Sequence, residues 1–378
     1  MEAVQKKSGF EALKYYYDNR DAYAKEWKAR GGKVVGYFCN AVPEEMIIAA
    51  GFLPYRISGD PTKKPIKLPR AYVPFDAGLA SMLSMVLTGD YDFLDYLIVP
   101  RSKSSIITAF AVLRDTKAMD PDAPFPEPYA FVRTQTTFDS SMDFNRESFS
   151  MLKAKLEEWA GKEITDDALR DAIKVCNETR ALLKKLEACR ADESLPVSGT
   201  DALRMIAPAM FMDKAEYNKL LAETLADLPK NGGGKVRVFV SGGPKDNTQL
   251  YEAIESCGAT VVGEDHCWGN RYSEDPVDES DPDPMHAIFH RYIFLKGCPN
   301  VYPMQSRIDT SAKFAARAKP QAAVFSTYEE DSMGWDIPGE IKAVEEQGVK
   351  TVYLMAQPYV VDAEAVKKTV SELIADCQ

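Results

Sequence analysis

The sequence predicts an α/β protein with two Rossmann-like or flavodoxin-like parallel-sheet domains, an intervening helical segment and an N-terminal helix. Three observations predict it. Apolar strands alternate with helices in both halves of the chain, the middle of the chain carries helical periodicity alone, and residues 231–234 (NGGG) break the chain before a new strand. Such alternation is typical of a parallel sheet covered on both faces. We therefore expect the N-terminal helix and first α/β domain in 1–141, a helical bridging segment in 142–231 and the second α/β domain in 232–378.

Residues 33–58 (KVVGYFCNAVPEEMIIAAGFLPYRIS) are the most informative part of the chain. A strand at 34–38 leads through a polar turn into a helix at 43–50 and then into a strand at 53–57. Proline and acidic residues suit the first turn of a helix, and Gly51 is a typical helix end. Parallel α/β domains bind ligands at the carboxyl ends of their strands. At that edge lie four candidate site residues, Cys39, Asn40, Glu44 and Glu45.

The remaining elements follow from apolar periodicity and turn residues. The N-terminal helix is expected at 8–31, and the helical middle at 142–191 and 198–229, with Thr165 as a helix N-cap. In the first domain we further expect strands at 96–99 and 130–134, and helices at 76–88 and 104–115. In the second domain we expect strands at 236–240, 260–262, 322–325 and 351–355, and helices at 247–256, 284–294, 310–318, 338–347 and 362–376.

Composition excludes several classes of protein. A chain of 378 residues is long enough for two domains. Its net charge of −11 argues against binding to nucleic acid or to an anionic membrane surface, since both need basic patches. No apolar run reaches the length of a bilayer span, and the charged N-terminus has no signal-peptide core, so we expect a cytoplasmic protein. Seven scattered cysteines without a C-x-x-C pair argue against a disulfide framework.

Several motifs have both a functional and a structural interpretation. Residues 241–244 (SGGP) follow a strand, so they are either a phosphate cradle at a helix N-terminus or a plain tight turn. His286 and His290 share a helical face, but HAIFH lacks the Glu of the H-E-x-x-H zinc motif, so we predict no metal site. Arg271 follows a predicted strand, and Arg56 ends one. For each of them two roles are open, namely binding a ligand oxygen and forming an ion pair within the protein. For Arg271 the partner would be a nearby carboxylate, Glu264 or Asp265.

The stretch 33–58, together with VRVFVSGGPKDN (236–247), GEDHCWGNRY (263–272), KGCP (296–299) and WDIP (335–338), resembles the 2-hydroxyacyl-CoA dehydratase and benzoyl-CoA reductase family. The resemblance covers roughly residues 30 to 375 and is to the smaller type of dehydratase D-component subunit. It implies a reductive reaction on a CoA thioester. A separate ATP-hydrolysing activator supplies one electron, and a ketyl radical forms. The active protein would contain two related subunits.

The resemblance also implies a [4Fe–4S] cluster between the domains, held by cysteine thiolates. The three cysteine positions of the family correspond here to Asp76, Lys103 and approximately Glu330, and none of them is a thiol. We therefore expect that this chain alone binds no cofactor, that the cluster belongs to the partner subunit, and that these three charged groups converge as a salt-bridge cluster. A cluster held by Cys39 and Cys267 with other ligands is the alternative.

For the reaction itself, Glu44 or Glu45 is the candidate for proton handling, because a desolvated carboxylate would have a raised pKa. First-turn helix stabilisation is the alternative role for both. The candidate contacts to the CoA thioester are Cys39, Asn40, Arg56, Cys267, Asn270 and Arg271. Three other functions stay open, namely a subunit of a benzoyl-CoA reductase-type ring reductase, a non-catalytic scaffold or regulatory subunit, and a stand-alone acyl-CoA-binding protein.

Overall fold

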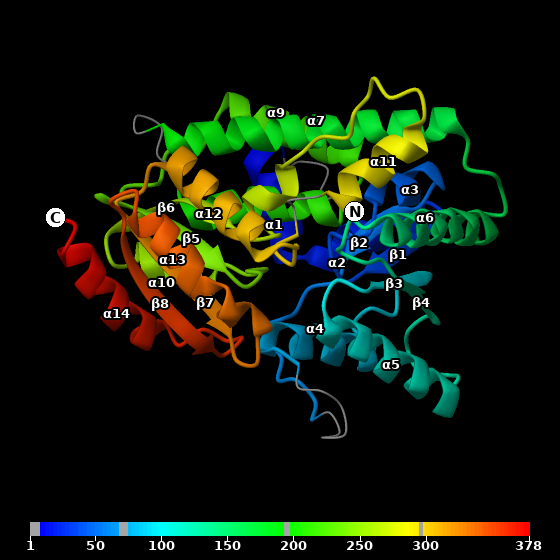
Figure 1. The fold of residues 1–378 in the computed structure, drawn as a ribbon, viewed down its shortest axis with the longest axis horizontal. Helices are drawn as coiled ribbons and strands as arrows, with labels where there is room; N and C mark the ends of the chain where they lie inside the picture. Colours follow the sequence, from blue (N-terminus) through cyan, green and yellow to red (C-terminus); the bar gives the residue numbers. More distant parts are fainter. Residues whose placement is uncertain (1–7, 68–74, 193–196, 295–297) are drawn as a thin grey trace.

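Two four-stranded parallel sheets form the frame of the molecule (Figure 1). The structure is a computed structural model that describes residues 8–67, 75–192, 197–294 and 298–378. The first two residues of the KGCP motif therefore lie outside the described residues. The predicted α/β class is confirmed, since every strand pair in both sheets is parallel.

The first sheet has the strand order β2-β1-β3-β4. Its strands are β1 (Val34–Tyr37), β2 (Leu53–Arg56), β3 (Tyr96–Pro100) and β4 (Pro128–Phe131). Its connecting helices are α3 (Glu44–Ala49), α4 (Ala77–Leu87) and α5 (Ser104–Met119). The chain leaves β1 to one side for β2 and then crosses to the other side for β3. The point where strand order reverses, between β1 and β3, is where open α/β sheets form their ligand crevice.

The second sheet repeats this topology in the order β6-β5-β7-β8. Its strands are β5 (Val236–Gly242), β6 (Ala259–Asp265), β7 (Ala322–Tyr328) and β8 (Lys350–Gln357). Its helices are α10 (Gln249–Glu255), α11 (Pro284–Ile293), α12 (Met304–Ala318), α13 (Ile337–Glu345) and α14 (Ala363–Ala375), with short 3₁₀ turns η2 (Asn270–Ser273) and η3 (Ser332–Trp335).

The strands of the second sheet run two or three residues past their predicted ends. Polar residues continue the ladder there, because Ser241 pairs with Asp265 and Gly242 pairs with Ser326. Apolar content alone therefore underestimated these strands. One consequence concerns the SGGP motif, since Ser241 and Gly242 belong to β5 and α10 begins only at Gln249. The glycines form the strand end and a tight turn, and the helix does not follow them directly.

The middle of the chain is helical, and residues 139–192 and 197–226, which the structure describes, contain no strand. Its helices are α6 (Asp139–Ala160), α7 (Asp166–Ala191), α8 (Gly199–Ile206), the 3₁₀ turn η1 (Ala207–Met210) and α9 (Lys214–Ala226). Thr165 caps α7 as expected, accepting a hydrogen bond from the Ala168 amide at 3.2 Å. Helix α7 packs on α3 of the first half and on β6 of the second, so it spans both sheets (Figure 1). The domain boundaries near 141 and 231 stay predictions.

The N-terminal segment forms two helices, α1 (Gly9–Asp18) and α2 (Arg20–Ala29), and not the single helix that was predicted. The chain turns at Asn19, whose backbone leaves the helical region with φ −126° and ψ 66°. The break lets α1 pack on α9 while α2 lies against β1. No helix among the described residues is both long and apolar enough to cross a membrane.

Gly242 is required by the close approach of two strands. Its φ is +122°, and a Cβ atom there would lie 2.2 Å from the backbone oxygen of Ser326 in β7. We expect Gly242→Ala to destabilise the protein by about 1–3 kcal/mol, through backbone strain and displacement of β7. Urea unfolding measures this. Gly233→Ala is the matched control, because a Cβ at Gly233 meets nothing within 4 Å. Equal stability of both variants would contradict the interpretation.

Candidate functional site

Four charged side chains meet where the carboxyl ends of the two sheets face each other. Asp76 and Lys103 come from the first half and precede α4 and α5. Lys245 and Asp331 come from the second half and follow β5 and β7. A Cβ atom at Gly243 would lie 3.1 Å from Asp331 Oδ2 and 3.7 Å from Lys245 Nζ. The group, which we call the seam cluster, joins two halves that are distant in sequence.

Lys103 is the centre of the seam cluster. Its Nζ forms an ion pair with Asp76 Oδ2 and lies 3.7 Å from Asp331 Oδ1. Burial lowers the pKa of Lys103, but the carboxylates of Asp76 and Asp331 outweigh burial and hold that pKa above its usual value. The third member is Asp331, and the prediction of Glu330 is wrong. Glu330 is exposed and has φ +60°, and this left-handed residue turns the next side chain inward.

Lys245 was missed by the sequence reasoning, although it directly follows the SGGP motif. Its side chain is 4% exposed, and Nζ donates to the backbone oxygen of Ser326 at 3.2 Å. Nζ also lies 4.2 Å from the centre of the Tyr328 ring. Burial lowers the pKa of Lys245 to about 8, although Asp331, Asp246 and Asp76 oppose the shift. The sequence does contain a feature that could have indicated Lys245, because this lysine lies beside a glycine turn at the carboxyl end of a predicted strand.

Cys39, Cys267 and Cys298 lie close together around Arg56. Arg56 Nη2 donates to Cys267 Sγ at 2.7 Å, and Nη1 donates to the Cys267 backbone oxygen at 2.6 Å. A hydrogen bond from the Cys298 thiol lowers the pKa of Cys39, and the guanidinium of Arg56 adds to this effect. Arg56 also stacks on Trp268, with 4.4 Å between the guanidinium carbon and the ring centre. Arg56 therefore joins the two halves of the chain through both of its Nη atoms, while its buried Nε has no hydrogen-bond partner among the described residues.

Glu44 and Glu45, the candidates for proton handling, are each held by buried cations. Glu44 accepts from Lys214 Nζ at 2.8 Å and from the Tyr272 hydroxyl at 2.6 Å. Glu45 forms an ion pair with Arg180 and accepts from the Tyr292 hydroxyl at 2.8 Å.

The space around these carboxylates is small, and the electrostatics differ from the expectation. Burial raises the pKa of Glu45, but Arg180 and Arg291 outweigh it and lower that pKa to about 2, so the expected increase is wrong for Glu45. The adjoining cavity of about 10 Å³ is too small for a substrate group. The geometry favours the structural role for this pair.

The remaining candidates are also engaged by the protein. Arg271 pairs with Asp265, including a 3.0 Å contact from Nη2 to Oδ2, which is the ion-pair interpretation. Glu264, the other possible partner, is bound by Arg190 at 2.7 Å. Asn270 is the exception, because it is buried near Gly263 of β6, inside the second half, and its Nδ2 has no hydrogen-bond partner among the described residues. Asn40 is buried, and its Oδ1 lies 3.6 Å from the Cys39 thiol.

The donor set of the seam cluster does not fit an iron–sulfur cluster. Cubane iron binds thiolates, whereas this position presents two carboxylates and two ammonium groups, and one of the ammonium groups, that of Lys103, already pairs with Asp76. Among the described residues, no group of three or more His, Cys, Asp or Glu side chains has a metal-binding arrangement. Both histidines of the HAIFH motif lie on α11, and His286 bonds Asp281 at 2.6 Å.

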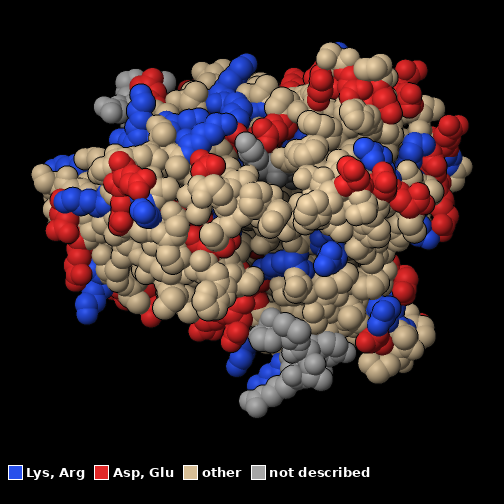
Figure 2. Space-filling model, viewed as in Figure 1, with Lys and Arg blue, Asp and Glu red and all other residues tan. Residues whose placement is uncertain are grey.

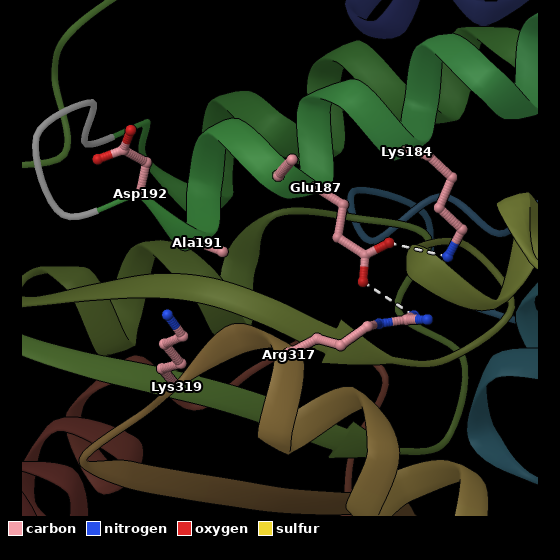
Figure 3. A pocket seen from close by; sticks show the side chains of 7 residues that line it. Lys184, Glu187, Ala191, Asp192, Arg317 and Lys319 are labelled. Atoms are coloured by element: carbon pink, nitrogen blue, oxygen red, sulfur yellow. Dashed lines mark hydrogen bonds and ion pairs between the residues drawn. The ribbon is translucent and has the colours of Figure 1, made fainter.

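Two cavities among the described residues have volumes of about 470 and 480 Å³. One, of about 480 Å³, lies at the same junction, between Ser58 and Gly59 after β2 and Asn247 and Thr248 after β5. The other, of about 470 Å³, lies at the opposite end of the second sheet, between α7 and α12 (Figure 3).

The cavity between α7 and α12 is less suited to catalysis. Basic side chains gather over this region of the surface (Figure 2). However, Lys184 and Arg317 both point to Glu187, at 2.9 Å each, so their charges are already paired (Figure 3). The cavity at the junction lies at the carboxyl ends of the strands, where parallel α/β sheets bind ligands.

Fold and site together define an α/β protein with two parallel sheets and a cluster of buried charges at the carboxyl ends of their strands. The chain belongs to the family of the 2-hydroxyglutaryl-CoA dehydratase D-component, whose sequence model matches residues 39–374. It is 28% identical to the beta subunit of (R)-2-hydroxyglutaryl-CoA dehydratase from Acidaminococcus fermentans over 266 residues, which is 68% of each chain. It is also 28% identical to a benzoyl-CoA reductase subunit from Thauera aromatica, over 72% of each chain. The (R)-phenyllactyl-CoA dehydratase beta subunit of Clostridium sporogenes is 24% identical over 91% of this chain and 92% of its own.

The Glu45–Arg180 pair predicts a pH-dependent stability. Because the pKa of Glu45 is about 2 in the folded state and near the ordinary 4.5 when unfolded, its contribution is full above pH 4.5 and falls as pH decreases toward 2. We expect Glu45→Gln to cost about 3 kcal/mol of unfolding free energy at pH 7, and less below pH 4.5. Urea unfolding across pH measures this, with exposed Glu147→Gln as the control. A pH-independent difference would contradict the assignment.

Proposed function

We propose that this chain is a subunit of a 2-hydroxyacyl-CoA dehydratase-type enzyme, in which it shapes the CoA-thioester cleft and a related partner subunit carries the [4Fe–4S] cluster. The observation that carries the proposal is the seam cluster. The family's sequence model matches nearly the whole chain, but the expected thiolate positions hold Asp76, Lys103 and approximately Glu330, and the neighbouring Asp331 faces Lys103. The relatives are named as subunits of dehydratases and of a reductase, which supports assembly with a partner.

The partner's cluster would supply the one-electron chemistry, with an ATP-hydrolysing activator as the source of the electron. This chain's own residues would bind and enclose the thioester. The cavity of about 480 Å³ has the size of a small-molecule site, and it lies between the segments that follow β2 and β5, with Ser58, Gly59 and Asn247 in its lining. Lys245, with a pKa of about 8, is the side chain at this edge best placed to hold or release a proton near neutral pH.

A second function, that of a non-catalytic scaffold subunit, is favoured by one observation. Lys103 of the seam cluster is already paired with Asp76 and lies 3.7 Å from Asp331, so this cation is neutralised by protein groups without any ligand. A ring-reductase subunit fits the same frame, because the benzoyl-CoA reductase relative is as similar as the dehydratase relative, at 28% identity.

Anaerobic purification of the native complex tests the proposed function. We expect a second, related polypeptide to co-purify, with about four irons per heterodimer and all of them on the partner. Dehydration of a 2-hydroxyacyl-CoA should then require both chains and an ATP-dependent activator. A native complex with partner but no dehydration or ring reduction would support the scaffold. A lone monomer with full dehydratase activity would refute both.

Reconstitution with iron and sulfide tests the degenerate cluster position. We expect the wild-type chain alone to take up no cluster, because an ammonium group offers no lone pair to iron. The triple variant Asp76→Cys, Lys103→Cys, Asp331→Cys should gain about four irons and a broad absorption near roughly 400 nm.

The matched control replaces Glu330 in place of Asp331, together with the same two substitutions. Since Glu330 is exposed and Asp331 points inward, this control should gain no cluster. About four irons on the wild-type chain would show that the cluster has other ligands, and Cys39, Cys267 and Cys298 would be the first to replace.

A further inference from the structure

A small cavity of about 220 Å³ lies beyond the carboxyl end of β4 and contains a buried arginine. Its wall is formed by the segment after β4, by the end of α11 and by the start of α12. Arg133, Gln135, Asn300, Tyr302 and Ser306 line it. The described residues that line the cavity include no Asp or Glu, in a chain whose net charge is −11.

Arg133 pairs with no carboxylate among the described residues, although its charge acts on the nearby, buried Cys298 thiol. Its side chain is 4% exposed, its Nε is buried without a hydrogen bond, and no ion pair reaches its guanidinium. Other buried arginines differ, since Arg180, Arg190 and Arg271 each pair with a carboxylate. Burying a charge without a partner is costly, and the cost is removed when an anion occupies the cavity.

The start of α12 adds a second source of positive potential. This helix has 15 residues, begins at Met304 and has Pro303 at its N-cap, which makes no side-chain hydrogen bond to the first turn. The first-turn residue Ser306 lines the same cavity as Arg133. A helix N-terminus presents N–H groups and a partial positive charge, both of which favour an anion.

From these observations we propose that the cavity is an oxyanion site, in which Arg133 binds a carboxylate or phosphate group. A guanidinium offers two parallel N–H donors that match either group. A cavity of about 220 Å³ accommodates the anionic group and a short chain, but not a nucleotide.

The site also lies close to the seam cluster. Gln135 Nε2 donates to the backbone oxygen of Ser102 at 3.0 Å and to that of Asn300 at 2.8 Å. Ser102 directly precedes Lys103, so an anion here would lie next to the proposed cleft. The inference goes beyond the proposed function, because the site requires neither dehydration activity nor a partner subunit.

Equilibrium binding to the purified full-length chain tests the site. The probes are sodium acetate, its neutral isostere acetamide and inorganic phosphate, all at constant ionic strength, followed by calorimetry and thermal unfolding. We expect wild type to bind acetate or phosphate, but not acetamide, and to unfold at a higher temperature in its presence. Acetate binding without phosphate binding assigns a carboxylate site, and the reverse assigns a phosphate site.

Substitution identifies the residue. Arg133→Gln should weaken binding at least about tenfold and should unfold at a higher temperature than wild type without ligand, because it removes an unpaired buried charge. Arg114→Gln, an exposed residue paired with Asp115, should change neither property. Arg133→Lys keeps the charge without the planar fork, and should bind with intermediate affinity.

Two results would overturn the proposal. One is the absence of binding of acetate and phosphate to wild type up to about 20 mM, a concentration that corresponds to negligible affinity. The other is wild-type affinity in Arg133→Gln. If Arg133→Gln does not fold, the Arg133→Lys variant decides, since unchanged affinity there would exclude bidentate recognition. None of these results depends on dehydratase activity, so failure here leaves the proposed function standing.

Discussion

Neutralisation of buried charge between the two sheets is the constraint on which the rest of the structure depends. A backbone hydrogen bond from Ala77 N to Glu329 O, at 3.3 Å, joins the halves beside the seam cluster. Asp76 and Lys103 pair within the first half, and Asp331 of the second half adds a second carboxylate, 3.7 Å from Lys103 Nζ. Removing one partner of a buried pair typically costs about 3–5 kcal/mol, whereas the intact pair adds little net stability. The seam cluster therefore specifies how the halves dock more than how strongly they dock.

The same constraint explains why the carboxylates at the start of α3 are poor candidates for catalysis. Glu44 and Glu45 lie at the carboxyl edge of β1, where a ligand is expected, but their partners Lys214 and Arg180 come from the helical middle. Helix α7 lies across both sheets and carries Arg180 to Glu45 and Arg190 to Glu264 (Figure 1). The middle segment thus supplies cations to both sheets, and the cavity of about 480 Å³ near the ends of β2 and β5 is left as the larger space at this edge.

The sequence predicted the frame well and the side-chain partners poorly, for a physical reason. Strand and helix periodicity is local, so both sheets and the helical middle could be predicted. Partners such as Glu45 and Arg180 are 135 positions apart and leave no local signal. The choice of Glu330 over Asp331 failed for a local reason. Glu330 itself has a left-handed backbone conformation, so the side chain of the next residue points inward. The sequence does not distinguish two adjacent acidic residues. Arg133 was missed because a sequence does not show which buried donors lack a hydrogen bond. The fold shows that Arg133 Nε has none among the described residues.

The two lysines of the seam cluster differ in how they respond to burial. Lys103 lies against both carboxylates, and its pKa is raised above its usual value. Lys245 contacts a backbone oxygen and the face of Tyr328, and burial lowers its pKa to about 8. Release of the Lys245 proton makes the net charge of the cluster one unit more negative. A cluster that no longer offers soft ligands to a metal can therefore still exchange a proton near neutral pH, and Lys245 is the residue that would do so.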